Sequence, residues 1–283
     1  MNLSTLDYLA AAAAAAAAGA VNALAGGGTL ISFPTLVAIG VPPVNANVTN
    51  TVSLVPGYLT GSWAQRDDLK PQMGGARILV GVAAAGGLAG SIVLLAIPAQ
   101  AFRLAVPYLI VLSCVLLLLQ DRLRVYLAAR GARVKGAGPA SEPVDASAGG
   151  ADGQPAAGVG ERHGTSSPSA ALVASVFAAA AYGGFFGAGL SIMLLAVLGM
   201  FSWEPLTKLN ALKQALAFVV NLVAAVFFAF SDHVVWSLVL VMAAASMVGG
   251  LLGGRVVTVI DSGLLRKLVV VAGLAVAVSF WVA

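Results

Sequence analysis

The sequence predicts an all-α polytopic membrane protein with about eight hydrophobic helical segments in two four-segment repeats, the first segment of each repeat broken at glycines. Three observations predict this fold class: a composition that is 60% hydrophobic and 9% charged, a series of apolar runs of membrane-spanning length, and an internal repeat. Soluble domains carry about 25% charged residues. So few charges cannot build a water-facing surface, and lipid is therefore expected to cover much of the protein.

A membrane-spanning helix needs about 20 mostly apolar residues. Residues 130–169, by contrast, are rich in Gly, Ala, Pro and Ser and predict a disordered cytoplasmic linker. The expected domains are a first transmembrane repeat over residues 1–129, this linker, and a second transmembrane repeat over residues 170–283. The candidate segments are Tyr8–Gly40, Ala46–Ala64, Ile78–Ile97, Phe102–Leu119, Ala170–Met200, Leu206–Phe230, Val234–Gly253 and Leu264–Val282.

The two halves resemble each other at residue numbers that differ by 160. This offset places Gly90 on Gly250, Asn50 on Asn210, and Val82–Ala85 on Met242–Ala245. Near the same offset, the cluster Gly26-Gly27-Gly28 meets Gly187-Ala188-Gly189. An internal repeat is the usual plan of a secondary transporter.

The first segment of each half is too long for one straight span and is interrupted by glycines near its middle. Two interpretations remain: a long, tilted, broken helix that crosses the membrane, or a re-entrant pair of half-helices that does not cross. Cytoplasmic loops collect Lys and Arg, and only the re-entrant interpretation places Arg255, Arg266 and Lys267 inside with the basic residues of the linker. It leaves only Arg103 outside and makes the repeats inverted. We favour it, although the family pattern described below implies eight crossings.

Catalytic chemistry has little support in the sequence. All 11 carboxylates lie in loops, in the linker or at segment ends, and the two histidines, His163 and His233, are far apart. The single cysteine, Cys114, excludes an internal disulfide and a thiolate metal site. We therefore predict no enzyme, no catalytic residue, no metal and no cofactor.

The glycine interruptions are the first candidate site. A helix that restarts after such a break presents N–H groups and the positive end of its dipole, which favours anions. The alternative is that the glycines only permit close helix packing. The predicted site residues in these breaks are Gly26, Gly27, Gly28, Thr29, Gly187, Gly189 and Ser191.

Polar stripes on the following segment of each half are the second candidate. Amides, hydroxyls and cations are costly among lipid tails and must face a protein interior or water. Helical spacing groups Asn210, Lys213, Gln214, Ala217 and Asn221 in one half, and Asn50, Ser53, Gly57 and Gly61 in the other. The predicted substrate-binding residues of these stretches are Asn47, Thr49, Asn50, Thr51, Ser53, Asn210, Lys213, Gln214 and Asn221.

Lys213 carries the sharpest prediction, because it stands among amides with no carboxylate on its stripe. A negative ligand would supply its partner. The alternative is that the side chain extends to the interface. For Lys208, extension to the interface is favoured, because Glu204 lies one turn away and can pair with it.

At these residues the sequence resembles the TauE/SafE family of sulfite-exporter or anion-permease-like membrane proteins. The resemblance covers nearly the whole chain except the linker. It implies transport of small sulfur-containing or organic anions, such as sulfite or sulfonates, across the bacterial inner membrane. The matching features are Gly26–Gly28 with the apolar run to Pro34, the turn Gly40–Pro43, Ala46, Asn50-Thr51 and Gly86-x-x-x-Gly90, and, in the second copy, Gly187-x-Gly189, Asn210 and Gly249-Gly250.

The sequence therefore predicts a multi-pass secondary transporter in the cell inner membrane that moves a small anion and binds no nucleic acid. An ion gradient of protons or sodium is expected to drive it, because the chain contains no P-loop for ATP. The alternative function is a membrane-embedded scaffold or assembly factor without transport. A scaffold has little reason to keep Asn210, Lys213 and Asn221 on one face.

Overall fold

The computed structural model describes residues 3–24, 26–66, 73–136, 168–201, 205–256, 270–271, 273–278 and 280, and most of these residues are helical, with no strand among them. The prediction of an all-helical protein is therefore confirmed for the described part of the chain. Its helices, in chain order, are α1 Thr5–Leu24, α2 Thr29–Ala38, α3 Pro43–Ala64, α5 Met73–Ala96, α6 Ala99–Gly136, α7 Ala170–Phe185, α8 Leu190–Phe201, α9 Leu206–Ala229 and α10 Trp236–Val256.

Proline and serine fix several of the helix starts. Pro42 and Pro205 stand at the N-cap positions of α3 and α9, where a missing N–H removes no helical hydrogen bond. Ser169 caps α7 and accepts a hydrogen bond of 3.2 Å from the N–H of Leu172. Helix α6 continues to Gly136, so residues 130–136, which were assigned to the predicted linker, are helical. Residues 137–167 lie outside the described part.

Each long first segment consists of two helices separated by glycines in left-handed backbone conformations. Gly26 and Gly27 have φ values of 80° and 96°, and Gly187 and Gly189 have values of 79° and 83°. Residues other than glycine rarely adopt such φ values. The chain can therefore reverse at both positions.

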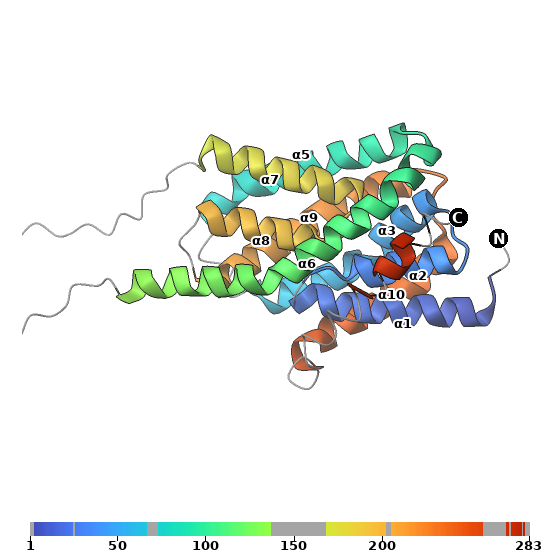
Figure 1. The fold of residues 1–283 in the computed structure, drawn as a ribbon, viewed down its shortest axis with the longest axis horizontal. Coiled ribbons are helices and arrows are strands. Elements are labelled where there is room, and N and C mark those ends of the chain that lie inside the picture. The colour runs from blue at the N-terminus through green and yellow to red at the C-terminus, as the bar shows by residue number, and fades with distance from the viewer. Residues whose placement is uncertain are drawn as a thin grey trace, which may run out of the picture.

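Figure 1 shows the two reversals. Helix α1 runs inward from the N-terminal side and α2 returns toward that side, whereas α7 enters from the opposite side and α8 returns toward it. A Cβ on Gly28 would meet the backbone oxygen of Ala18, and residues ten apart on one straight helix would lie about 15 Å apart. The chain therefore folds back at the first break.

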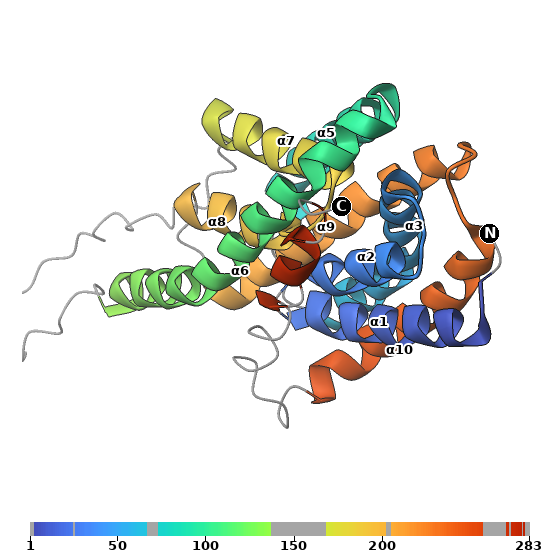
Figure 2. The ribbon, with the colours of Figure 1, turned by 45° about the vertical axis from the view of Figure 1, so that its right-hand side comes forward.

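The two halves pack reciprocally through small residues. Helix α10 of the second half packs on α1, and α5 of the first half packs on α7 (Figure 2). A Cβ added to Gly249 would collide with the backbone of Ala16, and a Cβ added to Gly90 would collide with the backbone of Ala181. Glycines at these contacts let helix backbones approach closely, as in many membrane proteins.

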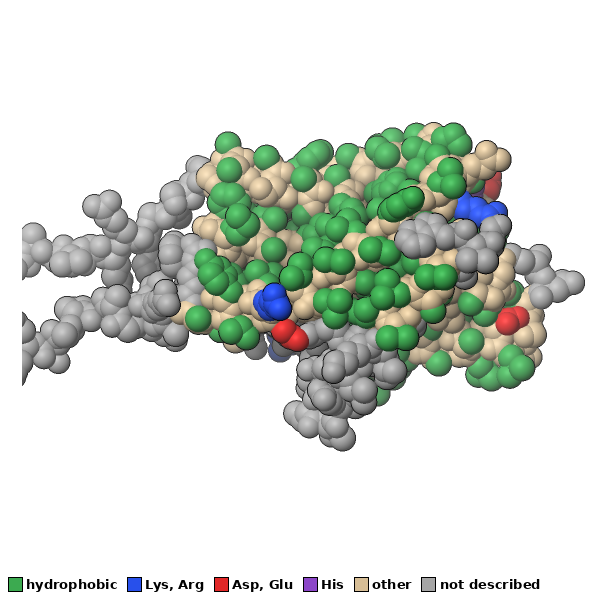
Figure 3. Space-filling view, in the orientation of Figure 1, with side chains coloured by type: hydrophobic (Ala, Val, Ile, Leu, Met, Phe, Trp, Pro, Cys, Tyr) green, Lys and Arg blue, Asp and Glu red, His purple; other side chains and the backbone are tan. Residues whose placement is uncertain are grey.

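Three helical stretches of the described chain are long and apolar enough to cross a membrane: Arg77–Ala96, Ala99–Ala129 and Leu206–Ala229. Other helices of the described chain are apolar but shorter than a membrane span, among them α2, α7 and α8. Hydrophobic side chains are spread over the face shown in Figure 3, and the few charged side chains on it lie singly or in pairs. Such a surface suits lipid contact.

Candidate functional site

The two glycine breaks meet inside the molecule. A Cβ on Gly26 would collide with the Cβ of Ser191, the second residue of α8. Gly26 is buried and Ser191 is 1% exposed. We call this contact region the break junction and define it by Asn22, Gly26, Gly28 and Ser191, together with Tyr58 and Asn221.

Asn22 is a component of the break junction that the sequence analysis missed. Its Oδ1 accepts a hydrogen bond of 2.7 Å from the N–H of Gly28. This bond fixes the orientation of the amide, so Nδ2 is a donor, and Nδ2 is buried without a partner. An amide in an otherwise apolar helix, four residues before a glycine cluster, is the sequence signal that could have identified it.

Ser191, on the other side of the contact with Gly26, supplies a second donor, a hydroxyl. Its Oγ is buried and makes no well-aligned hydrogen bond, but the Tyr58 hydroxyl lies close enough to interact with it. The buried hydroxyl of Tyr58 lies beside the side chains of Ser191 and Asn221. Asn221 donates from Nδ2 to the backbone oxygen of Ala217 at 2.8 Å. Tyr58 was missed because a tyrosine on an apolar stretch is indistinguishable from a packing residue.

Some backbone N–H groups in the first turn of α2 already donate to carbonyl oxygens of the first glycine break. The N–H groups of Leu30 and Ile31 donate to the oxygens of Gly27 and Gly28, each at 2.9 Å. With the N–H of Gly28 bonded to Asn22, fewer backbone donors are available for an anion than the sequence analysis expected. Side-chain donors therefore contribute more to the chemistry of the break junction. Thr29 begins this helix and is 5% exposed.

The second break is held by side chains of α6 and of α7, the helix that leads into it. The backbone oxygen of Ala188 accepts hydrogen bonds from Ser113 Oγ and from the hydroxyl of Tyr182, each at 2.9 Å. Gly189 packs against Ser113 and Leu116, which belong to α6. These contacts fix the turn that places Ser191 opposite Gly26.

The predicted stripe on α9 divides into two parts. Asn221 lies at the break junction, whereas Lys213 lies about 12 Å further toward the N-terminal end of α9, given a rise of 1.5 Å per residue. The Lys213 side chain is 0% exposed, and its Nζ donates to Asn210 Oδ1 at 2.7 Å. Asn210 Nδ2 in turn donates to Gln65 Oε1 at 2.7 Å. Gln65 was not among the residues predicted from the sequence. The cation is therefore fully enclosed.

Gln214 follows Lys213 and is also buried. Its backbone oxygen accepts a hydrogen bond of 3.2 Å from Ser62 Oγ. Its side-chain atoms Nε2 and Oε1 are both buried without a partner. A buried amide without partners costs free energy unless water or a ligand satisfies it.

The predicted residues on α3 have separate roles. The hydroxyls of Thr51 and Ser53 donate to carbonyl groups four residues earlier, at 2.9 and 2.7 Å, and are thus satisfied within their own helix. Thr49 Oγ1 accepts a hydrogen bond of 3.0 Å from the N–H of Val235. Asn47 Nδ2 donates to the oxygen of Phe185 at 2.9 Å. Asn50 Oδ1 is buried without a partner.

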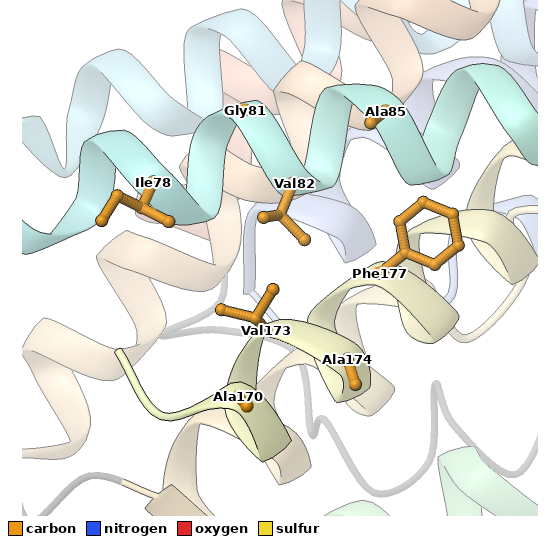
Figure 4. A pocket seen from close by; sticks show the side chains of 8 residues that line it. All are labelled: Ile78, Gly81, Val82, Ala85, Ala170, Val173, Ala174 and Phe177. Carbon is orange, nitrogen blue, oxygen red and sulfur yellow. The ribbon is translucent and has the colours of Figure 1, made fainter. Parts of the chain in front are cut away.

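A large apolar groove on the outer surface has the wrong chemistry for an anion. It has a volume of about 640 Å³, lies between α5 and α7, and exposes side chains such as Ile78, Val173 and Phe177 (Figure 4). A smaller cavity of about 330 Å³ lies at the turn between α2 and α3. It is lined in part by Arg103, whose charge can attract anions to that end of the molecule.

Comparison with known proteins identifies the family to which the chain belongs. A family model described as Sulfite exporter TauE/SafE matches residues 11–280. No curated protein and no solved structure matches the chain.

Proposed function

Because the chain belongs to the sulfite exporter TauE/SafE family, we propose that it is a secondary transporter of small anions, with sulfite, sulfonates and related organic anions as substrates, in the bacterial inner membrane. The observation that carries this proposal is the break junction. There the positive end of α8, the unpartnered donor Asn22 Nδ2 and the buried hydroxyl of Ser191, which lies beside that of Tyr58, occur at the contact between the two halves.

The chemistry of these groups selects an anion. Donors and a helix N-terminus stabilise negative charge, and the groups of the break junction carry no formal charge of their own. The substrate would accept hydrogen bonds from Asn22 and Ser191 and from the hydroxyl of Tyr58, all of them buried. Lys213 would add a long-range attraction from nearer the N-terminal end of α9.

The location of the site between the two halves suits alternating access. We infer that the repeats are inverted and that each hairpin, α1–α2 and α7–α8, enters the membrane and returns without crossing. Support comes from the opposite directions of the two hairpins (Figure 1) and from the Lys and Arg positions. Movement of one half against the other would then open the break junction to either side in turn.

Cysteine labelling tests this topology. A cysteine at His233, which is exposed, should react with an impermeant thiol reagent from outside the cell, and a cysteine at Ser262 only from inside. Variants built on a Cys114→Ala background avoid labelling of the native thiol. The reverse pattern would indicate eight crossings and remove the re-entrant hairpins.

Uptake into proteoliposomes tests the function. The purified protein should accumulate sulfite or a small alkanesulfonate in preference to acetate and to uncharged solutes. Ser191→Ala should raise the anion concentration for half-maximal uptake by about tenfold or more, because a hydrogen bond to a charged group contributes about 1.5–3 kcal/mol. The hydroxyl makes no well-aligned hydrogen bond and only neighbours that of Tyr58, so the substitution should change the melting temperature of the anion-free protein little.

Thr35→Val is the matched control. The Thr35 hydroxyl donates to the backbone oxygen of Ile31 on the same helix and lies outside the break junction. We expect uptake close to that of the parent. Proteoliposomes that accumulate none of the tested anions would favour the scaffold function instead, and equal affinities for Ser191→Ala and the parent would remove Ser191 from the site.

A further inference from the structure

Two buried acceptor atoms on α3 have a chemistry opposite to that of the break junction. Asn47 Oδ1 and Asn50 Oδ1 are both buried without a hydrogen-bond partner. The two residues are 1% exposed and lie three positions apart, which places their side chains about 5–6 Å apart on neighbouring turns of the helix. An anion would be repelled by two such oxygens, whereas a cation would be bound by them.

The orientation of the Asn47 amide is fixed by a neighbour. Its Nδ2 donates to the backbone oxygen of Phe185 at 2.9 Å. Exchange of the amide nitrogen and oxygen would place two oxygens against each other, so the atom left without a partner is the acceptor.

The surroundings of Asn47 also favour positive charge. Phe185 is the last residue of α7, a helix of 16 residues. The C-terminal end of a helix carries the negative end of its dipole and stabilises cations. The polar side chains of this part of α3 are neutral amides and hydroxyls, and no group of three or more His, Cys, Asp or Glu occurs among the described residues. A neutral set of oxygen ligands suits a monovalent cation better than a divalent one.

We propose that the amide oxygens of Asn47 and Asn50 bind the sodium ion that drives transport. The proposal rests on the proposed function. It also gives a physical link between the two sites, because the second break separates them by only four residues: α7 ends at Phe185 on the cation side, and α8 begins at Leu190 on the anion side. One interruption thus presents its negative end to the cation and its positive end to the anion.

Sodium dependence of the parent protein is the first part of the test. Anion uptake into proteoliposomes should rise at least about fivefold with an inward sodium gradient. An equal potassium gradient, or a proton gradient in sodium-free medium, should have little effect. Equal uptake in sodium-free medium would overturn the sodium site while leaving anion transport in place. Absence of anion uptake under every gradient would instead contradict the proposed function.

Thermal stability provides a readout that does not depend on transport. Sodium chloride should raise the melting temperature of the parent protein above its value in potassium chloride at equal concentration, and Asn50→Leu should abolish this difference. A sodium-specific shift that persists in Asn50→Leu would contradict the assignment.

Three variants locate the site by uptake. Asn50→Leu should raise the sodium concentration for half-maximal uptake at least tenfold, with a change of less than about twofold in the anion affinity at saturating sodium. Asn50→Asp keeps an oxygen at the position and should retain sodium dependence, which covers the case in which Asn50→Leu does not fold. Asn45→Ala is the control, since this amide on the same helix is only partly buried and already donates to the oxygen of His233 at 3.0 Å. Loss of sodium dependence in Asn50→Asp would overturn the proposal. So would an Asn50→Leu variant whose sodium dependence equals that of the parent.

Discussion

Gly26→Ala should abolish most of the transport activity and lower the thermal stability of the protein. The backbone of Gly26 has a φ of 80°, and its Cα faces Ser191 across the break junction. A methyl group there adds backbone strain of about 1–2 kcal/mol and overpacking of about 1–3 kcal/mol. Uptake at limiting substrate and the melting temperature in detergent measure the two effects.

Gly40→Ala separates strain from collision. Gly40 has a φ of 89°, but an added Cβ would meet nothing within 4 Å. This variant should show only the strain and should retain most of its transport. The double variant Gly26→Ala with Ser191→Gly should recover part of the lost stability without recovering anion affinity. A Gly26→Ala variant as stable and active as Gly40→Ala would contradict the close contact between the two breaks.

Lys213→Met should weaken the apparent affinity for the transported anion by about tenfold with little loss of stability. The side chain is 0% exposed, so water screens its charge poorly. Two unit charges about 12 Å apart interact by about 1.4 kcal/mol at an effective dielectric constant of 20, which corresponds to a factor of about ten. Concentration dependence of uptake in proteoliposomes gives this affinity.

Two further lysine variants bracket the effect. Lys213→Arg keeps the charge in a different shape and should retain part of the affinity. Lys208→Met is the control, because Lys208 is only half-buried and solvent screens its charge. If Lys213→Met and the parent take up limiting substrate at the same rate, Lys213 has no role in attracting the anion.

Sequence patterns predicted the helical architecture of the described part of the chain. Glycine clusters marked the interruptions because residues such as Gly26 and Gly187 adopt φ values that other residues avoid. The stripe on α9 included Asn221, because helical spacing alone puts polar residues on one face. These predictions required only local rules.

The members of the break junction required tertiary information. Asn22 bonds to Gly28 because the chain reverses between them, and Tyr58 reaches Ser191 because α3 packs near the second break. The sequence also grouped Lys213 with Asn221 in one site, although the rise of the helix separates them by about 12 Å. Periodicity identifies a shared face but not the position of a binding partner along the helix.

Equilibrium binding of a radiolabelled sulfonate to the purified protein in detergent is the most direct test of the break junction as an anion site. The parent protein and Thr35→Val should show saturable binding, and Ser191→Ala should bind about tenfold more weakly or worse. A Ser191→Ala variant that binds the sulfonate as tightly as the parent, or a parent protein that binds no small anion, would contradict the assignment.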